Sequence, residues 1–77
     1  MDITKYEIEL TRHALIRADE REIEPFMYLA TIKGGRIERT GKNAIKFSKE
    51  YKNLEVICIG EIFPGWIKIL TIERIKK

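Results

Sequence analysis

The residues 63–66, Phe-Pro-Gly-Trp, constrain the fold more than any other part of the sequence, because they form a strong turn signal between two apolar runs. Proline fixes φ at one central position of a turn, and glycine allows a positive φ at the next. The segment therefore predicts a hairpin that joins a strand over 55–62 to a strand over 67–75. The first strand has apolar residues on both faces, which indicates a central strand; they are Leu54, Val56 and Cys58 on one face and Ile57 and Ile59 on the other.

Alternation of apolar and polar residues predicts further strands earlier in the chain. Residues 5–10 and 44–48 alternate in this way, as expected of half-buried strands. Residues 36–39 form a shorter strand, which ends at a turn around Gly41. The second half of the chain is therefore expected to be mostly sheet.

Two helices are predicted between the first two strands. Thr11 is a favourable N-cap for a helix over 12–21, whose narrow apolar face consists of Ala14, Leu15 and Ala18. Pro25 occupies the first position of a second helix, where no backbone N–H is needed, and Gly34-Gly35 ends that helix. The second helix is apolar over most of its circumference, which indicates either deep burial or partial cover by a partner.

These elements predict a single α+β domain over residues 1–77, in the order β-α-α-β-β-β-β. The two N-terminal helices should pack on one face of a twisted antiparallel sheet. The lone cysteine, Cys58, excludes an intramolecular disulfide, and the lone histidine, His13, excludes a Cys/His zinc cluster. No metal or other cofactor is expected, and Cys58 should be a buried apolar residue rather than a nucleophile.

The composition favours a cytoplasmic protein from a thermophile. Fourteen Ile, two Asn and no Gln accompany many Lys and Glu, which is a thermophilic pattern, although AT-rich codon usage produces a similar bias. The N-terminal residues lack a basic segment followed by an apolar stretch, so no signal peptide is expected. No apolar run approaches about 20 residues, so no membrane association is expected either.

The net charge of +3 is unevenly distributed along the sequence. Residues 1–38 contain six Lys/Arg and eight Asp/Glu, a net −2, whereas residues 39–77 contain nine and four, a net +5. A basic sheet region favours contact with nucleic acid, and we expect Lys46, Lys49 and Lys68 to bind RNA phosphates. The alternative is an ordinary solvated surface.

His13 is the candidate catalytic residue. It lies in the first turn of the predicted helix 12–21, where the helix dipole disfavours a positive charge, and a neutral imidazole could serve as a general base toward a ribose 2′-OH. Arg17 and Arg21 follow on the same stripe of the helix and could hold a phosphate by bidentate hydrogen bonds. In the structural alternative, His13 bonds a neighbouring strand and the arginines pair with carboxylates such as Glu20.

This segment carries a resemblance to a known family. His13-Ala14, Arg17 and Arg21, followed by the second helix, resemble a small family of domains of unknown function that begin with a His-Ala-x-x-Arg-x-x-x-Arg-Gly-Ile helix. That family is similar to the RelE- and BrnT-like toxins, metal-independent ribonucleases with helices packed on an antiparallel sheet. The resemblance implies a RelE-like fold and RNA cleavage or RNA binding, often under the control of an antitoxin partner.

The sequence departs from the family pattern at two places. Glu22 occupies the position of the usual glycine. Toxins of this type generally carry an arginine late in the sheet, and here Glu73 occupies that place while Arg74 lies one residue beyond it. Because a one-residue offset turns a strand side chain to the opposite face, the orientation of Arg74 decides whether it reaches His13.

The leading hypothesis is a metal-independent endoribonuclease of the toxin type, in which His13, Arg17 and Arg74 are catalytic and Arg21 joins the lysines in binding RNA. One alternative is a non-catalytic RNA-binding domain that uses the same basic face. The other is a protein-interaction module that uses the second helix and the sheet edge at Arg36–Arg39, with a homodimer left open. The positions of His13, Lys46 and Arg74 distinguish these hypotheses. If the three lie on one concave face, the ribonuclease is favoured. A flat basic sheet would favour RNA binding, and dispersal of the three residues would favour the interaction module.

Overall fold

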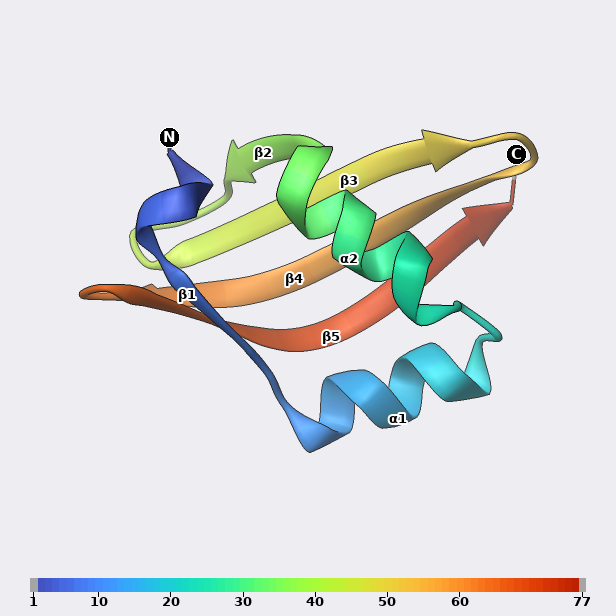
Figure 1. The fold of residues 1–77 in the computed structure, drawn as a ribbon, viewed down its shortest axis with the longest axis horizontal. Helices are drawn as coiled ribbons and strands as arrows, with labels where there is room; N and C mark the ends of the chain where they lie inside the picture. The colour runs from blue at the N-terminus through green and yellow to red at the C-terminus, as the bar shows by residue number, and fades with distance from the viewer. Residues whose placement is uncertain (1, 77) are drawn as a thin grey trace.

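The structure is a computed structural model that describes residues 2–76 and has an α+β fold (Figure 1). A 3-10 helix, Ile3–Lys5, precedes strand β1, Glu7–Leu10, and helices α1, Arg12–Glu20, and α2, Pro25–Gly34. The remaining strands are β2, Arg36–Arg39, β3, Ala44–Tyr51, β4, Leu54–Phe63, and β5, Trp66–Lys76. The predicted order β-α-α-β-β-β-β is confirmed.

Residues 2–76 form one five-stranded sheet in the order β1-β5-β4-β3-β2. Strand β4 is central, as predicted, and both of its neighbours run antiparallel to it. The sheet is mixed rather than wholly antiparallel, because β1 pairs in parallel with β5, with Glu7 opposite Trp66. The alternation of residues 5–10 indicated a half-buried strand, but alternation carries no information about the partner strand or its direction.

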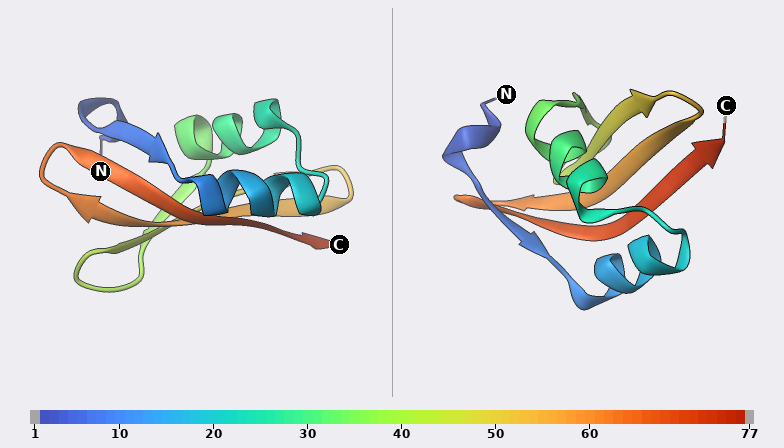
Figure 2. Two further views of the ribbon diagram at one scale, coloured as in Figure 1. Left: turned by 90° about the horizontal axis from the view of Figure 1, so that it is seen from below. Right: turned by 45° about the vertical axis from the view of Figure 1, so that its right-hand side comes forward.

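Both helices pack on the same face of the sheet, as predicted (Figure 2). Helix α1 contacts β5, whereas α2 contacts β3 and β4. The other face, which we call the open face, is not covered by any helix of residues 2–76. The core between the two layers consists of Ala14, Ala18, Ile23, Tyr28, Ile32, Ile45, Phe47, Val56, Cys58, Ile67, Ile69 and Ile72.

Helix α1 has defined caps at both ends. The Thr11 hydroxyl accepts a hydrogen bond from the Ala14 N–H at 3.1 Å, as predicted for an N-cap, and donates one to the Ile69 carbonyl oxygen at 2.7 Å. Beyond the other end, Glu22 has a φ of 57°, a left-handed conformation that usually favours glycine.

Helix α2 is held to β3 through one backbone oxygen. The carbonyl oxygen of Met27 accepts a hydrogen bond from the Tyr51 hydroxyl at 2.7 Å and another from the Thr31 hydroxyl at 2.7 Å. Thr31 is completely buried, and its hydroxyl finds its hydrogen-bond acceptor, the Met27 carbonyl oxygen, within α2 itself. The bond from Tyr51 ties α2 to the end of β3.

The predicted turn at 63–66 is confirmed. Phe63 pairs with Trp66 at the end of the β4–β5 hairpin, and Gly65 has a φ of 81°. The aromatic rings of Phe63 and Trp66 stack with their centroids 4.4 Å apart. Trp66 therefore packs against its own hairpin, as expected from its place beside the turn.

A β-bulge in β5 sets the orientation of the second half of that strand. The register shifts between Ile59 and Gly60 of β4, which leaves Leu70 of β5 as an extra residue. Ile69 before the bulge and Ile72 after it are both completely buried beneath the helices. Even-numbered residues of β5 therefore face the helices beyond the bulge, whereas odd-numbered residues face them before it.

Candidate functional site

His13 and Arg17 lie on α1, and His13 is exposed. The guanidinium of Arg17 is 3.6 Å from the carboxylate of Glu20 in an ion pair whose side chains are both largely exposed. Arg21 follows the helix directly, and its backbone N–H donates to the carbonyl oxygen of Arg17 at 3.0 Å. The pairing of Arg17 with a carboxylate is the one foreseen in the structural alternative for this helix.

The bulge turns Arg74 to the helix side of the sheet. Arg74 lies opposite Val56, a completely buried core residue, whereas Glu73 lies opposite Ile57 on the open face. The structure thus places Arg74, and not Glu73, on the side of the sheet that carries the helices.

Arg74 and His13 are nevertheless separated along β5. Thr11, two residues before His13, is hydrogen-bonded to Ile69. Arg74 lies five residues further along the strand, which corresponds to about 15 Å at the usual rise of a β-strand. The structure therefore does not place Arg74 beside His13.

Lys46 and Lys68 lie on the open face, where acidic side chains accompany them. The ammonium of Lys46 is 3.6 Å from the carboxylate of Glu38. Lys68 lies opposite Glu61 of β4 and Glu9 of β1. The open face is therefore mixed in charge and is not a continuous basic surface.

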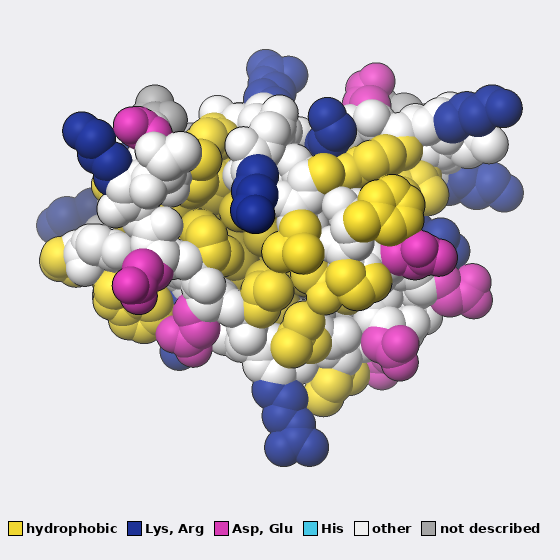
Figure 3. All heavy atoms as spheres, viewed as in Figure 1, with side chains coloured by type: hydrophobic (Ala, Val, Ile, Leu, Met, Phe, Trp, Pro, Cys, Tyr) yellow, Lys and Arg dark blue, Asp and Glu magenta, His cyan; other side chains and the backbone are white. Residues whose placement is uncertain are grey.

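Four cations of the described chain gather at the β3–β4 turn and the end of β5, a region that we call the cationic end: Lys49, Lys52, Arg74 and Lys76. Lys49 and Arg74 flank Val56 on the helix side of the sheet. A shallow hollow of about 230 Å³ is lined by Arg74 and Lys76 together with Asn53 and Leu54. Figure 3 shows basic side chains projecting at this end, in the upper right of the view.

Among the described residues, four large apolar side chains of the helices are 39–64% exposed, and we call them the apolar patch: Leu15, Ile16, Phe26 and Leu29. Figure 3 shows apolar side chains gathered over the helix layer. Phe26, in the first turn of α2, is the most exposed of the set at 64%. The apolar character of α2 predicted part of this surface, but the expectation that Leu15 belongs to the buried face of α1 is corrected, because its side chain reaches solvent between the helices.

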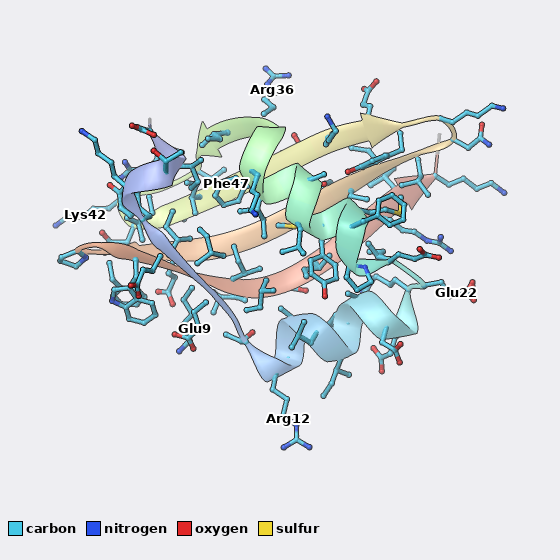
Figure 4. All side chains as sticks on the ribbon, viewed as in Figure 1. Glu9, Arg12, Glu22, Arg36, Lys42 and Phe47 are labelled. Atoms are coloured by element: carbon cyan, nitrogen blue, oxygen red, sulfur yellow. The ribbon has the colours of Figure 1, made fainter. Side chains whose placement is uncertain are left out.

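A groove runs beside the apolar patch between α1 and α2. It encloses about 220 Å³ and is lined by Leu15, Ala18, Asp19, Ile23, Pro25 and Tyr28. Three exposed carboxylates line the groove or lie next in sequence to residues that line it, and we call them the acidic rim: Asp19, Glu22 and Glu24. Glu22 is labelled in Figure 4 at the end of α1, where its side chain points away from the sheet.

Cys58 is completely buried in the core, as predicted. Burial raises the pKa of its thiol from the ordinary value of 9.0 to about 12, so the thiolate required of a nucleophile is disfavoured. No cluster of three or more His, Cys, Asp or Glu side chains within residues 2–76 is arranged to hold a metal ion. Neither helix in the described part of the chain is long and apolar enough to cross a bilayer.

No family model, curated protein or solved structure matches this chain.

Proposed function

We propose that this domain is a protein-interaction module that binds a basic amphipathic helix of a partner protein in the groove between α1 and α2. The observation that carries the proposal is the apolar patch, because a small domain rarely leaves several large apolar side chains exposed side by side unless they are covered by a partner. Phe26, the most exposed member of the patch at 64%, is the natural central contact.

The shape of the groove and the charge around it define the partner. An amphipathic helix that lies in an apolar groove contributes side chains at positions i, i+3, i+4 and i+7. The acidic rim of Asp19, Glu22 and Glu24 would face the flanks of such a helix, so Lys or Arg on those flanks is complementary. The partner segment is therefore apolar on one side and basic at its borders.

The distribution of the predicted catalytic residues supports this proposal over the ribonuclease. His13 lies on α1, Lys46 lies on the open face in an ion pair with Glu38, and Arg74 lies at the cationic end. Such dispersal is the arrangement expected of an interaction module.

The test uses a labelled model peptide of Leu and Lys in an amphipathic helical pattern and measures its binding by fluorescence anisotropy. Phe26→Asp should weaken binding at least about tenfold, because it removes a central apolar contact from the interface. Ile75→Asp is the matched control, since Ile75 is 50% exposed but lies on β5 away from the groove. The proposal fails if Ile75→Asp weakens binding as much, or if a peptide of Leu and Glu binds equally well.

RNA binding is a second candidate function, and the cationic end is the observation that favours it. Lys49 and Arg74, both expected from the sequence to bind RNA or act on it, share this region, whereas Lys46 is engaged with Glu38. Arg74 and Lys76 line the hollow, with Lys49 and Lys52 in the same region of the fold. Cations grouped in this way form a suitable site for a phosphate backbone.

This second candidate is tested by measuring the affinity for single-stranded RNA as a function of salt. Arg74→Glu should weaken binding and make the salt dependence less steep, because one phosphate contact fewer releases fewer counterions. Lys68→Glu, on the open face, should change binding much less. Equal losses for the two variants, or affinity that does not respond to salt, would rule out the cationic end as an RNA site.

A further inference from the structure

Within residues 2–76, strand β2 is an edge strand, and no strand pairs with its outer side. The Thr40 N–H donates to the Ala44 carbonyl oxygen at 3.1 Å, so this is a hydrogen-bonded pair of the β2–β3 ladder. Because bonded and non-bonded pairs alternate in an antiparallel ladder, Arg36 and Glu38 also direct their backbone groups toward β3. The N–H and C=O of Ile37 therefore point outward, away from the sheet.

The side chains along this edge are complementary to their own reversed copy. Arg36 and Glu38 carry opposite charges, lie one residue on either side of Ile37 and share the open face. We infer that the edge binds a second copy of this chain, with the two β2 strands antiparallel and Ile37 opposite Ile37. Arg36 of each copy then lies opposite Glu38 of the other, which gives two attractive pairs related by a two-fold axis.

The charges select this register over the neighbouring symmetric one. A two-fold axis at Glu38 would place the Glu38 carboxylates opposite each other and Ile37 opposite Arg39, both of which are unfavourable. The axis at Ile37 also sets the outward N–H of Ile37 in each copy against the outward C=O of Ile37 in the other, so that both hydrogen bonds can form.

The neighbouring residues leave room for the second strand. In the Ile37 register, Arg39 of one copy lies opposite Gly35 of the other, which has an extended backbone and no side chain. The guanidinium of Arg39 donates to the carbonyl oxygen of Lys42 at 2.8 Å and is thereby held in its own hairpin. Figure 4 shows Arg36 at the edge of the sheet with its side chain pointing away from the molecule.

An existing ion pair extends the charge pattern across the edge. The ammonium of Lys46 lies 3.6 Å from the carboxylate of Glu38. Arg36 of the second copy would approach the other side of the same carboxylate, so positive, negative and positive side chains would alternate in one row on the open face. The two sheets would join into one continuous sheet with all helices on the same side.

The experiment measures the oligomeric state of the full chain by sedimentation velocity over a range of concentrations. The wild type should show a concentration-dependent dimer. Arg36→Glu and Glu38→Arg should each raise the dimer dissociation constant at least about tenfold, because each turns two attractive pairs into two repulsive ones. An equimolar mixture of the two variants should restore association, since only the heterodimer places Glu opposite Arg at both positions.

Matched controls separate this edge from other surfaces. Arg12→Glu and Glu9→Arg make the same charge changes at exposed positions away from β2 and should leave the dimer unchanged. Thermal melting of the variants verifies that they are folded. A wild type that stays monomeric at millimolar concentration, a mixture that fails to associate, or a dimer lost in Phe26→Asp but kept in both edge variants would overturn the inference.

Discussion

The backbone N–H of Ile23 donates a hydrogen bond to the carbonyl oxygen of Ala18, 2.8 Å away. This bond spans one residue more than a helical hydrogen bond, and it forms because Glu22 takes a φ of 57° between α1 and Ile23. The Glu22 N–H donates to the Asp19 carbonyl oxygen at 3.1 Å and completes the arrangement. Together these contacts are a Schellman cap, which normally places glycine where this chain has Glu22.

Replacement of Glu22 by glycine should therefore stabilise the protein. A side chain in the left-handed region costs about 1 kcal/mol, and Glu22→Gly removes that cost while the capping hydrogen bonds remain. The gain is measured as a higher free energy of unfolding in urea. Glu22→Ala is the control, because it removes the charge but keeps a Cβ; an equal gain in both variants would attribute the effect to charge instead.

The adjacent glycines at the end of α2 should respond in opposite directions to substitution by alanine. A Cβ at Gly34 would have no heavy atom within 4 Å, so Gly34→Ala should raise the free energy of unfolding by about 0.5–1 kcal/mol. A Cβ at Gly35 would meet the carbonyl oxygen of Ser48 at 2.5 Å, and Gly35→Ala should lower it by about 1–3 kcal/mol. Urea titrations check both values, and equal effects at the two positions would contradict the close packing of Gly35 against the Ser48 backbone.

Stability should fall in alkaline solution because of Cys58. The thiol has a pKa of about 12 in the folded state against an ordinary value of 9.0, so the unfolded chain loses its proton first as the pH rises. The thiol leaves the free energy of unfolding unchanged below about pH 9, where it is protonated in both states. Above that pH it should lower the free energy of unfolding, by about 2–3 kcal/mol at about pH 11. The comparison of wild type with Cys58→Ala isolates this contribution, and identical pH profiles would show that the thiol is not protected.

His13→Ala should leave the free energy of unfolding unchanged within about 0.5 kcal/mol, because the imidazole is exposed. The same variant then tests catalysis directly, with total RNA as substrate in EDTA. For an interaction module we expect no cleavage that depends on His13. A loss of about 10²–10⁴-fold in a wild-type cleavage rate, with the melting temperature preserved, would restore His13 as a general acid or base.

The parts of the fold that the sequence predicts are those that depend on local patterns. The 63–66 turn, the N-cap at Thr11 and the start of α2 at Pro25 each follow from residues within a few positions of one another. The central position of β4 follows from apolar residues on both of its faces, although the open face carries no helix of residues 2–76. The partner of β1 could not be predicted in this way, because its pairing with β5 depends on residues at the far end of the chain.

The arrangement of the candidate site was less predictable for a related reason. Whether Arg74 or Glu73 faces the helices depends on the bulge at Leu70. The spacing of the buried isoleucines reflects the bulge. Ile67 and Ile69 are two residues apart, but the next buried isoleucine, Ile72, follows after three. The exposure of the apolar patch depends on how far apart the helices sit on the sheet, and no local pattern records that distance.

The parallel contact between β1 and β5 also affects how the chain can reach its native state. The Thr11 hydroxyl, immediately after β1, bonds to a carbonyl oxygen 58 residues later in the sequence. Contacts between such distant residues close a long loop and slow folding. During synthesis, β1 and α1 leave the ribosome first but find the strand on which they pack only when β5 has emerged. The edges of β1 and β4 that pair with β5 therefore stay exposed on the nascent chain until β5 is made, in addition to the outer edges that remain open in the folded sheet.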